Sequence, residues 1–386
     1  MRHKEFTPLS SSASPAPFPH WMLREIHEQP ETLAATLNHY VANNTFNPET
    51  CKPVFEWLNE LQSRILIAAS GSSRHASMVA ELSIETICDI DVDVEYASEY
   101  CYRSEKGLSN ASVLVVSQSG ETADTLAALR KAVAAGHRTL AITNVDNSTM
   151  AREATGSFPT LAGRERAIPA TKSFTGQLLN LYLLALMTAL SRKAIDEQQL
   201  ATLLAEANQL PAHVKAQLPA WQEALHTIAA AYSKTRTFLF LGRGLHYPLA
   251  REGALKLKES AYLHAEGYPS GELKHGPNAL VAEGTPLVML ATCDRSDKES
   301  VLRYEKVLQL MEDMHKQGAS LIAIANTGDE AVAKLATHTI AVDEMSEPLL
   351  AICEVIPLQL FSYFMAINNG IDVDNPRNLT KAVLSE

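Results

Sequence analysis

Short apolar runs alternate with helical stretches along most of the chain, and this alternation occurs twice. The first half contains RILIAASGSS, SVLVVSQSGETADT and HRTLAITNVDNS, and roughly 175 residues later the second half contains TFLFLGRGLHYP, PLVMLATCDRS and ASLIAIANTGDE. Continuous apolar strands separated by helices are typical of parallel sheets that are covered on both faces. We therefore predict an α/β protein with two doubly wound parallel-sheet domains related by internal duplication.

The same pattern divides the chain of 386 residues into five segments. We expect a disordered Ser/Pro-rich tail over 1–18, a helical lead-in over 19–49, a first domain over 50–200, a second domain over 201–370 and a C-terminal tail over 371–386. The apolar stretch LLNLYLLALMTAL is too short to cross a bilayer, so we expect a buried helix there.

The composition argues against several classes of protein. A formal net charge of -11 disfavours nucleic acid or an anionic membrane as the main partner. The five scattered cysteines include no C-x-x-C pair, which disfavours a disulfide framework or a zinc site and fits a reducing compartment. Without a signal-peptide pattern at the N-terminus, we expect a cytoplasmic protein.

Hydroxyl side chains follow two of the predicted strands in the first domain. SGSS (70–73) follows RILIAA, and SQSGET (117–122) follows SVLVV. Ligands bind at the carboxyl ends of strands in doubly wound sheets, and a helix N-terminus attracts an anion. One such loop is more often a simple helix cap, but two together predict a phosphate-like ligand. The helix after the second loop is expected to place Leu126, Leu129 and Val133 on one face.

Three further motifs carry ionisable side chains. In EGALKLKES, Glu252, Lys256 and Glu259 fall on one helical face, a spacing that suits a solvated ion-paired face as well as a catalytic one. His275 in SGELKHGPNAL is by itself more often structural than catalytic. Lys381 would normally be solvated near a chain end, but the apolar and turn-forming residues around it indicate a docked tail.

Together these motifs resemble the sugar isomerase (SIS) family, and most closely the isomerase half of glucosamine-6-phosphate synthase, the glutamine–fructose-6-phosphate transaminase. The resemblance covers nearly everything after residue 18, from HWMLREIHEQP through SQSGETADTLAALR, GRGLHYPLAREGALKLKE and GELKHGP to DVDNPRNLTKAVLSE. It implies two flavodoxin-like SIS domains and a phosphorylated hexose or hexosamine as substrate. The phosphate-binding positions that it implies are Ser72, Ser73, Ser117, Gln118, Ser119 and Thr122.

The resemblance also implies roles for the ionisable residues. Glu259 would move a proton between C1 and C2 of the sugar, with Glu252 and Lys256 as ordering and charge-balancing neighbours. His275 would assist ring opening from the neighbouring subunit, so a homodimer with shared active sites would be the smallest working unit. Lys381 would form a Schiff base with the ketose carbonyl, for which burial would have to lower its pKa.

Sugar-contacting positions implied by the resemblance are Ile168, Ala170 and Arg377, the last of which would fix the tail or pair with Glu259. Two features depart from the family pattern. The synthase has a glutaminase nucleophile at position 2, where this chain has Arg2, so we expect no glutaminase domain here. The family's ASTK loop reads PATK at 169–172, so that Ala170 replaces a sugar-contacting serine. The preceding GRERAI is unusually basic. Both changes leave the identity of the sugar undecided.

We therefore expect an enzyme that interconverts glucosamine 6-phosphate, or another aminohexose 6-phosphate, and fructose 6-phosphate with release or uptake of ammonia. No metal or redox cofactor is needed. Deamination is favoured because water is far more concentrated than free ammonia. The alternatives are an ammonia-using synthase subunit with a separate glutaminase, a fructosamine-6-phosphate deglycase and a non-catalytic phosphosugar sensor. Retention of Glu259, His275 and Lys381 argues against the sensor.

Overall fold

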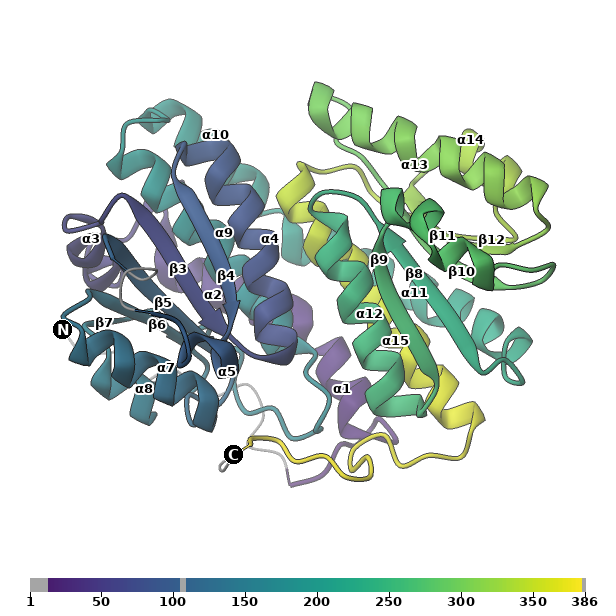
Figure 1. Ribbon diagram of the computed structural model, residues 1–386, viewed down its shortest axis with the longest axis horizontal. Helices are drawn as coiled ribbons and strands as arrows, with labels where there is room; N and C mark the ends of the chain where they lie inside the picture. The colour runs from purple at the N-terminus through teal and green to yellow at the C-terminus, as the bar shows by residue number, and fades with distance from the viewer. Residues whose placement is uncertain (1–12, 105–108, 384–386) are drawn as a thin grey trace.

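Two five-stranded sheets form the framework of the computed structural model, which describes residues 13–104 and 109–383 (Figure 1). Across the first sheet the order is β4 (Asp91–Tyr96), β3 (Arg64–Ala69), β5 (Ala111–Ser117), β6 (Thr139–Thr143) and β7 (Gly156–Ser157). Across the second it is β9 (His264–Pro269), β8 (Thr237–Gly242), β10 (Pro286–Ala291), β11 (Ser320–Asn326) and β12 (His338–Val342). Every pairing in both sheets is parallel, and both follow the flavodoxin-like order 2-1-3-4-5. The predicted pair of doubly wound α/β domains is confirmed.

Helices cover both faces of each sheet. The outer face of the first sheet carries α5 (Ala97–Tyr100), α7 (Ala123–Ala134) and α8 (Thr149–Glu153), and that of the second carries α13 (Lys298–Lys316) and α14 (Glu330–Leu335). Between the sheets lie α4 (Gly71–Cys88), α9 (Lys172–Ser191), α12 (His246–Ala261) and α15 (Glu347–Asn368) (Figure 1). The two domains thus share one central layer of helices.

Alternating side chains explain why the strands are apolar throughout. In β3, Ile65 and Ile67 join the core that contains the central helices, whereas Leu66 and Ala68 pack on the side of α5 and α7. β8 behaves in the same way, with Phe240 directed to the central layer and Leu241 to the outer one. Side chains from both sheets and the central helices therefore form one continuous core.

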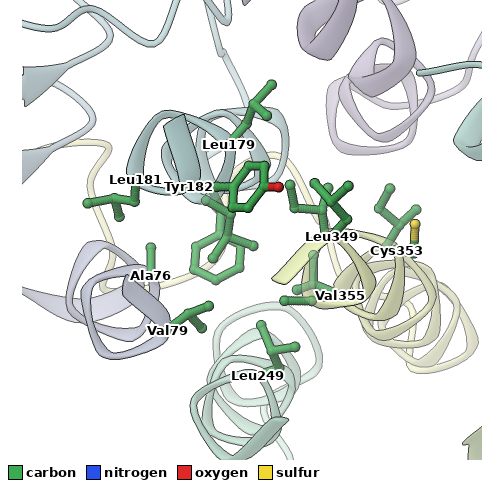
Figure 2. Packing of buried hydrophobic residues seen from close by; sticks show 14 of the residues in the cluster. Ala76, Val79, Leu179, Leu181, Tyr182, Leu249, Leu349, Cys353 and Val355 are labelled. Atoms are coloured by element: carbon green, nitrogen blue, oxygen red, sulfur yellow. The ribbon is translucent and has the colours of Figure 1, made fainter. Parts of the chain in front are cut away.

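Two of the central helices, α9 and α15, are long and apolar enough to span a membrane by length and composition alone. In each, 94% of the most apolar window is buried inside the protein. Figure 2 shows Leu179 and Tyr182 of α9 close to Leu349 of α15, with Leu249 of α12 below. Both are therefore core helices, as the sequence predicted for LLNLYLLALMTAL.

The segments outside the sheets are mainly helical. Residues 13–18, placed by the sequence in a disordered tail, form a turn in which Phe18 packs against the core, while 1–12 lie outside the described residues. The lead-in holds α1 (Trp21–His27), α2 (Gln29–Tyr40) and a small hairpin, β1 (Val41–Ala42) and β2 (Thr45–Phe46), and is followed by α3 (Lys52–Leu58). The proposed boundary at 200 falls inside α10 (Glu197–Ala207), which α11 (Leu210–Ala231) follows.

The prediction of which face of α7 is buried is partly wrong. Leu129 is buried, but Val133 is 45% exposed, and the residues buried beside Leu129 are Thr125, Ala128 and Ala132. The helix begins only at Ala123, and small residues fit the close approach to β5. Gly136 follows the C-cap residue Ala135 and has a φ of +79°, the left-handed conformation that commonly ends a helix.

Gly120 makes the tight turn between β5 and α7. Its φ is +66°, which L side chains rarely adopt, and a Cβ there would lie 2.2 Å from Oγ of Ser148. The position therefore requires glycine for two independent reasons.

We predict that Gly120→Ala lowers the free energy of unfolding by about 2 kcal/mol or more, because strain and a steric clash add. Gly136→Ala is the matched control, since its φ is also positive but nothing lies within 4 Å of the added Cβ. That change should cost only about 1 kcal/mol. Urea unfolding of both variants measures the difference, and equal losses would contradict the steric argument.

Candidate active site

Both hydroxyl loops lie where the strand order of the first sheet reverses. β3 and β5 are neighbours with Ala69 opposite Val116, so the loops after them start side by side. Ser117 Oγ accepts a hydrogen bond from Gly120 N (3.1 Å) and lies 3.3 Å from the Thr122 hydroxyl. Thr122 is the N-cap of α7 but makes no side-chain cap bond. This hydroxyl is therefore not used as an ordinary cap. Of the N–H groups at the start of α7, that of Ala123 donates to Val383 O of the tail, and those that follow it in the first turn remain for an anion.

A buried ion network connects the first loop to the second domain. Ser72 donates a 2.8 Å hydrogen bond to Oε1 of Glu252, and Nδ1 of His75 lies 2.7 Å from Oε2. Lys256 Nζ lies 3.4 Å from Glu252 Oε1 and 2.5 Å from Glu259 Oε2. Glu252 and Lys256 are 0% and 1% exposed, whereas the side chain of Glu259 is 23% exposed. Glu259 is therefore the member of the network that a ligand can reach.

The charges in this network stabilise one another. Burial by itself raises the pKa of Glu252, but Lys256, His75 and Ser72 bring it below the usual value. Burial lowers the pKa of Lys256, but the carboxylates of Glu259 and Glu252 raise it above its ordinary value, so Lys256 stays an ammonium. Within the described part of the chain, no hydrogen bond or ion pair reaches Oε1 of Glu259. One carboxylate oxygen of Glu259 is thus anchored by Lys256, and the other has no partner among the described residues.

The C-terminal tail runs from the second domain across to the first (Figure 1). The carboxylate of Asp374 accepts hydrogen bonds from the N–H groups of Trp21 (2.8 Å) and Met22 (2.9 Å). The guanidinium of Arg377 lies 4.2 Å from the ring centroid of Tyr262, whose hydroxyl accepts from Arg377 N. Of the two roles expected for Arg377, tail docking is therefore present, whereas the partner of Glu259 is Lys256.

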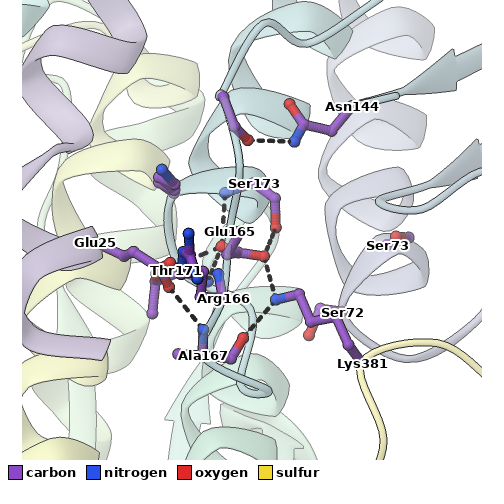
Figure 3. Close-up of polar contacts among 12 residues, drawn as sticks. Glu25, Ser72, Ser73, Asn144, Glu165, Arg166, Ala167, Thr171, Ser173 and Lys381 are labelled. Carbon is purple, nitrogen blue, oxygen red and sulfur yellow. Dashed lines mark hydrogen bonds and ion pairs between the residues drawn. The ribbon is translucent and has the colours of Figure 1, made fainter. Parts of the chain in front are cut away.

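The end of the tail reaches the start of α7, directly after the second hydroxyl loop. Val383 O accepts a 3.0 Å bond from the N–H of Ala123, the first residue of α7. Lys381 Nζ lies 2.6 Å from Glu165 Oε2 and donates to Ala167 O, also at 2.6 Å (Figure 3). The bond from Ala123 to Val383 and the two contacts of Lys381 thus hold the end of the tail at the hydroxyl-loop end of the first sheet.

Glu165 is fully buried and is the centre of this contact (Figure 3). It accepts hydrogen bonds from Thr171 N at 2.9 Å and from Ser173 Oγ at 2.6 Å. Burial raises its pKa, but the Lys381 ammonium and these hydrogen bonds outweigh burial and lower it to about 2. Lys381 therefore faces a charged carboxylate, and this ion pair must open before the amine can act as a nucleophile.

A pocket of about 680 Å³ joins a hydroxyl loop to the tail. Its walls come from the loops after β5 and β6, from the segment that precedes α9 and from the tail: Gln118, Ser119, Asn144, Val145, Asp146, Asn147, Leu161, Gly163, Arg164, Glu165 and Lys381. A pocket of this size accommodates a small organic ligand. Three sequence-derived candidates, Gln118, Ser119 and Lys381, therefore meet in one cavity.

Other candidates lie elsewhere. His275 is exposed at the end of a 3₁₀ helix (Ser270–His275), and its side chain makes no hydrogen bond or ion pair with any described residue. Ser73 is buried and accepts from Gln177 Nε2 at 3.0 Å. Ile168 and Ala170 are half-buried in the loop before α9, and their contact with a sugar stays a prediction.

A family model described as SIS domain matches residues 60–187 and 231–369. The chain belongs to this family. The SIS chain is 41% identical over 376 residues to glutamine–fructose-6-phosphate aminotransferase [isomerizing] of Chlorobaculum tepidum, covering 96% of this chain and 59% of the relative. The protein of the same name in Bordetella parapertussis is 42% identical over 379 residues, covering 98% and 60%. The chain thus spans about three fifths of the length of these curated relatives.

Solved structures agree with the sequence comparison. The SIS chain matches the C-terminal domain of glucosamine-fructose-6-phosphate aminotransferase from Francisella tularensis with a TM-score of 0.86 and 37% identity, covering 95% of this chain and 100% of that one. Glucosamine-6-phosphate deaminase from Thermotoga maritima matches with a TM-score of 0.69 at 23% identity, covering 94% and 99%, which shows a shared fold. The resemblance to the isomerase half of the aminotransferase is confirmed.

Sequence reasoning missed four residues that organise the candidate site. His75 stands one helical turn after Ser72, so its i, i+3 spacing was a usable signal. Glu165 and Asp374 lie in irregular segments without periodicity, and Glu25 is an acidic residue on an amphipathic helix, where exposure is the usual expectation.

Glu25 is a buried carboxyl beside the loop that carries Glu165. It is 1% exposed and accepts hydrogen bonds from the N–H groups of Arg166 (2.5 Å) and Ala167 (3.2 Å). Burial and the charge of Glu165 raise the pKa of Glu25 to about 8 from an ordinary value of 4.5. Because the folded-state pKa is the higher one, the stabilisation linked to its proton is complete below pH 4.5 and is lost as the pH rises through 8.

We predict that Glu25→Gln, which stays neutral, is close to wild type in stability at pH 5 but more stable by about 1–3 kcal/mol at pH 9. Urea unfolding at both pH values tests this. Glu31→Gln, on the exposed ion pair with Lys215, is the control and should show no such pH dependence. A difference between wild type and the Glu25 variant that does not change with pH would contradict the assignment.

Proposed function

We propose that this SIS protein interconverts an aminohexose 6-phosphate, with glucosamine 6-phosphate as the first candidate, and fructose 6-phosphate. The observation that carries the proposal is the hydrogen-bonded connection from Ser72 through Glu252 and Lys256 to Glu259. It couples a predicted phosphate loop in one domain to a reachable carboxylate in the other. In this proposal the phosphate of the sugar binds at the loops, and C1 and C2 lie at that carboxylate.

The phosphate would be held by the hydroxyls and helix N-termini of the two loops rather than by a cationic clamp. Ser117, Gln118, Ser119 and Thr122 are the candidate ligands from the second loop, and Ser73 is the candidate from the first. Neutral donors around a helix N-terminus bind an anion without adding a positive charge of their own.

The reaction then needs a proton transfer between two adjacent carbons. After ring opening, Oε1 of Glu259 would take the proton from C2 of the aminoaldose to give an enolamine, and protonation at C1 would give the imine of the ketose. Addition of water to C2 and loss of ammonia complete the conversion to fructose 6-phosphate. Lys256 would keep the carboxylate in place throughout, since it holds the other oxygen.

Deamination is the favoured direction in this proposal. The imine partitions between water and ammonia, and water is by far the more abundant unless ammonia is delivered to the site. The second candidate is amination of fructose 6-phosphate. It is favoured by the similarity to proteins named aminotransferase and by the docked Lys381, which would form a Schiff base with the ketose once its ion pair with Glu165 opens.

His275 would serve the active site of a second copy of the chain. Its exposed position and its lack of a side-chain partner among the described residues fit a group that acts outside its own subunit. A homodimer with shared active sites follows from this proposal. A separate glutaminase is a further partner only if the amination reaction is the physiological one.

The first experiment measures ammonia and fructose 6-phosphate released from glucosamine 6-phosphate, with the reverse reaction run on fructose 6-phosphate plus ammonium or glutamine.

Two variants separate chemistry from binding. We predict that Glu259→Gln lowers kcat by about 10²–10⁴-fold with little change in substrate affinity. Ser119→Ala should instead raise KM by about tenfold or more, because a hydrogen bond to a charged group is lost.

These outcomes also discriminate among the alternatives. Amination with ammonium but no deamination would support the synthase subunit, and activity on fructosamine 6-phosphates alone would support the deglycase. Affinity for phosphosugars without turnover would leave the sensor. A Glu259→Gln variant with full kcat would overturn the proposed base.

The shared site gives a separate prediction. Glu259→Gln and His275→Ala chains should each be inactive as pure dimers. A dimer that combines one chain of each variant contains one intact site, with Glu259 from one chain and His275 from the other. The mixture should therefore regain about a quarter of wild-type activity, since half of the dimers are mixed and each has one working site of two. A mixture that stays inactive would place His275 in the active site of its own chain.

A further inference from the structure

A second pocket, of about 450 Å³, lies at the switch point of the second sheet. Leu245 at its floor follows β8, and Asp294 and Asp297 at its edge follow β10. α4, α9 and α10 close it on the side of the first domain. The carboxyl ends of strands at a switch point are the usual ligand position of this architecture, so the place itself suits a site.

The strand register shows that this pocket has lost the phosphate-binding pattern. β3 and β8 each have six residues and are each followed by a glycine with positive φ, Gly71 at +53° and Gly244 at +59°. Ser72 therefore corresponds to Leu245. The next position, Ser73 in the first domain, is His246 in the second, and it lies between the carboxylates of Glu347 and Glu354.

The loop after the third strand changes in the same way. Leu66 pairs with Val113 in the first sheet, and Leu239 pairs with Leu287 at the same position of the second. On this register Ser117 and Ser119 correspond to Ala291 and Cys293, both of which are buried. The hydroxyls of Ser117 and Ser119 are thus absent from the equivalent positions. Thr122 corresponds to Ser296, which keeps a hydroxyl but donates it to Oδ1 of Asp294 at 2.6 Å.

The charge of the second pocket is also opposite in sign to what an anion needs. Its lining includes four carboxylates, from Asp294, Asp297, Glu299 and Glu347, against one guanidinium, from Arg303. Arg303 is already engaged, since its Nε donates to Glu347 at 3.0 Å and its Nη2 lies 3.5 Å from Asp297. Glu347 also lies 3.1 Å from Nε2 of His246, so its charge is compensated inside the protein. Asp294 and Glu299 form no ion pair with a described residue, and these two carboxylates attract a cation.

Two buried hydroxyls in the lining have no partner among the described residues. Tyr182 is 5% exposed, and its OH group makes no hydrogen bond. Figure 2 shows this hydroxyl turned toward Leu349 in the first turn of α15. Pro348, the residue before Leu349 in the chain, lines the pocket together with Ser346. The Oγ of Ser346 is the second unpartnered group. A buried polar group without a partner is costly, so both point to a ligand that supplies one.

We propose that this pocket binds a small organic cation, an ammonium group on an apolar body, as a ligand separate from the phosphosugar. The carboxylates of Asp294 and Asp297 face the ammonium, Leu82, Ile87 and Leu203 provide the apolar wall, and Tyr182 meets a polar group of the ligand. An aliphatic or aromatic amine satisfies all three features.

The site is distant from the proposed chemistry but mechanically connected to it. α12 begins at His246 beside the pocket, and Glu259 lies thirteen residues further, about 20 Å along the helix axis. A ligand that settles against Leu245 can shift the start of this helix. The binding proposal itself does not depend on the proposed reaction, so the two can fail independently.

Calorimetric titration of the full chain with three ligands tests whether the pocket selects a positive charge. All three have a phenyl ring on a two-carbon chain and differ in the charge of the terminal group. Phenethylammonium should bind at least tenfold more tightly than neutral 2-phenylethanol or anionic 3-phenylpropanoate. Saturating glucosamine 6-phosphate should not displace it. Equal binding of the three ligands, displacement by the phosphosugar, or no binding of phenethylammonium would overturn the proposal.

Variants locate the site. The double change Asp294→Asn and Asp297→Asn, at partly exposed positions, should weaken phenethylammonium binding at least tenfold. Asp146→Asn, in the pocket of the candidate active site, is the matched control and should leave it unchanged. Tyramine has a phenol that can meet the buried hydroxyl, so Tyr182→Phe should weaken its binding by several fold. The assignment would be overturned if the double Asn variant bound phenethylammonium, and Tyr182→Phe bound tyramine, as tightly as the wild type.

Discussion

The carboxylate of Glu252 holds the two halves of the candidate active site together. Its two oxygens are satisfied by Ser72 and His75 from the first domain and by Lys256 from its own helix. A buried ion pair is stable only when both charges and the remaining hydrogen-bond positions are satisfied, and this arrangement meets that condition. The position of Glu259 relative to the hydroxyl loops is thus decided by a contact between domains, which neither sheet could provide alone.

Close packing keeps α12 in the register that this contact needs. A Cβ at Gly253, next to Glu252, would lie 2.9 Å from Phe240 of β8 and 3.0 Å from Leu358 of α15. The helix therefore lies directly on the sheet and against its neighbour. The tail adds a second restraint, since Asp374 binds the start of α1 and Lys381 binds Glu165. Residues from both ends of the chain, among them Trp21 and Asp374, therefore line a pocket beside Glu165.

Much of the architecture could be predicted because its signals are local. Apolar runs of five to seven residues ending in small or polar residues indicated the central strands, and their repetition indicated the duplication. The edge strands of both sheets, β4, β7, β9 and β12, were missed. Polar or charged residues interrupt β4, β9 and β12, and β7 has only two residues. The predicted buried face of α7 was wrong at Val133. Packing close to the sheet selects small residues such as Ala128 rather than large apolar ones.

The sequence by itself determined the fold class, the two hydroxyl loops and the stripe of Glu252, Lys256 and Glu259, since each depends on residues that are near one another along the chain. Only the tertiary structure decided which of these charges are buried and which pair with which. Glu252 meets His75 across 177 residues, and Glu165 meets Lys381 across 216. Desolvation and ion pairing depend on distances in space, and local sequence patterns contain no information on contacts of that separation.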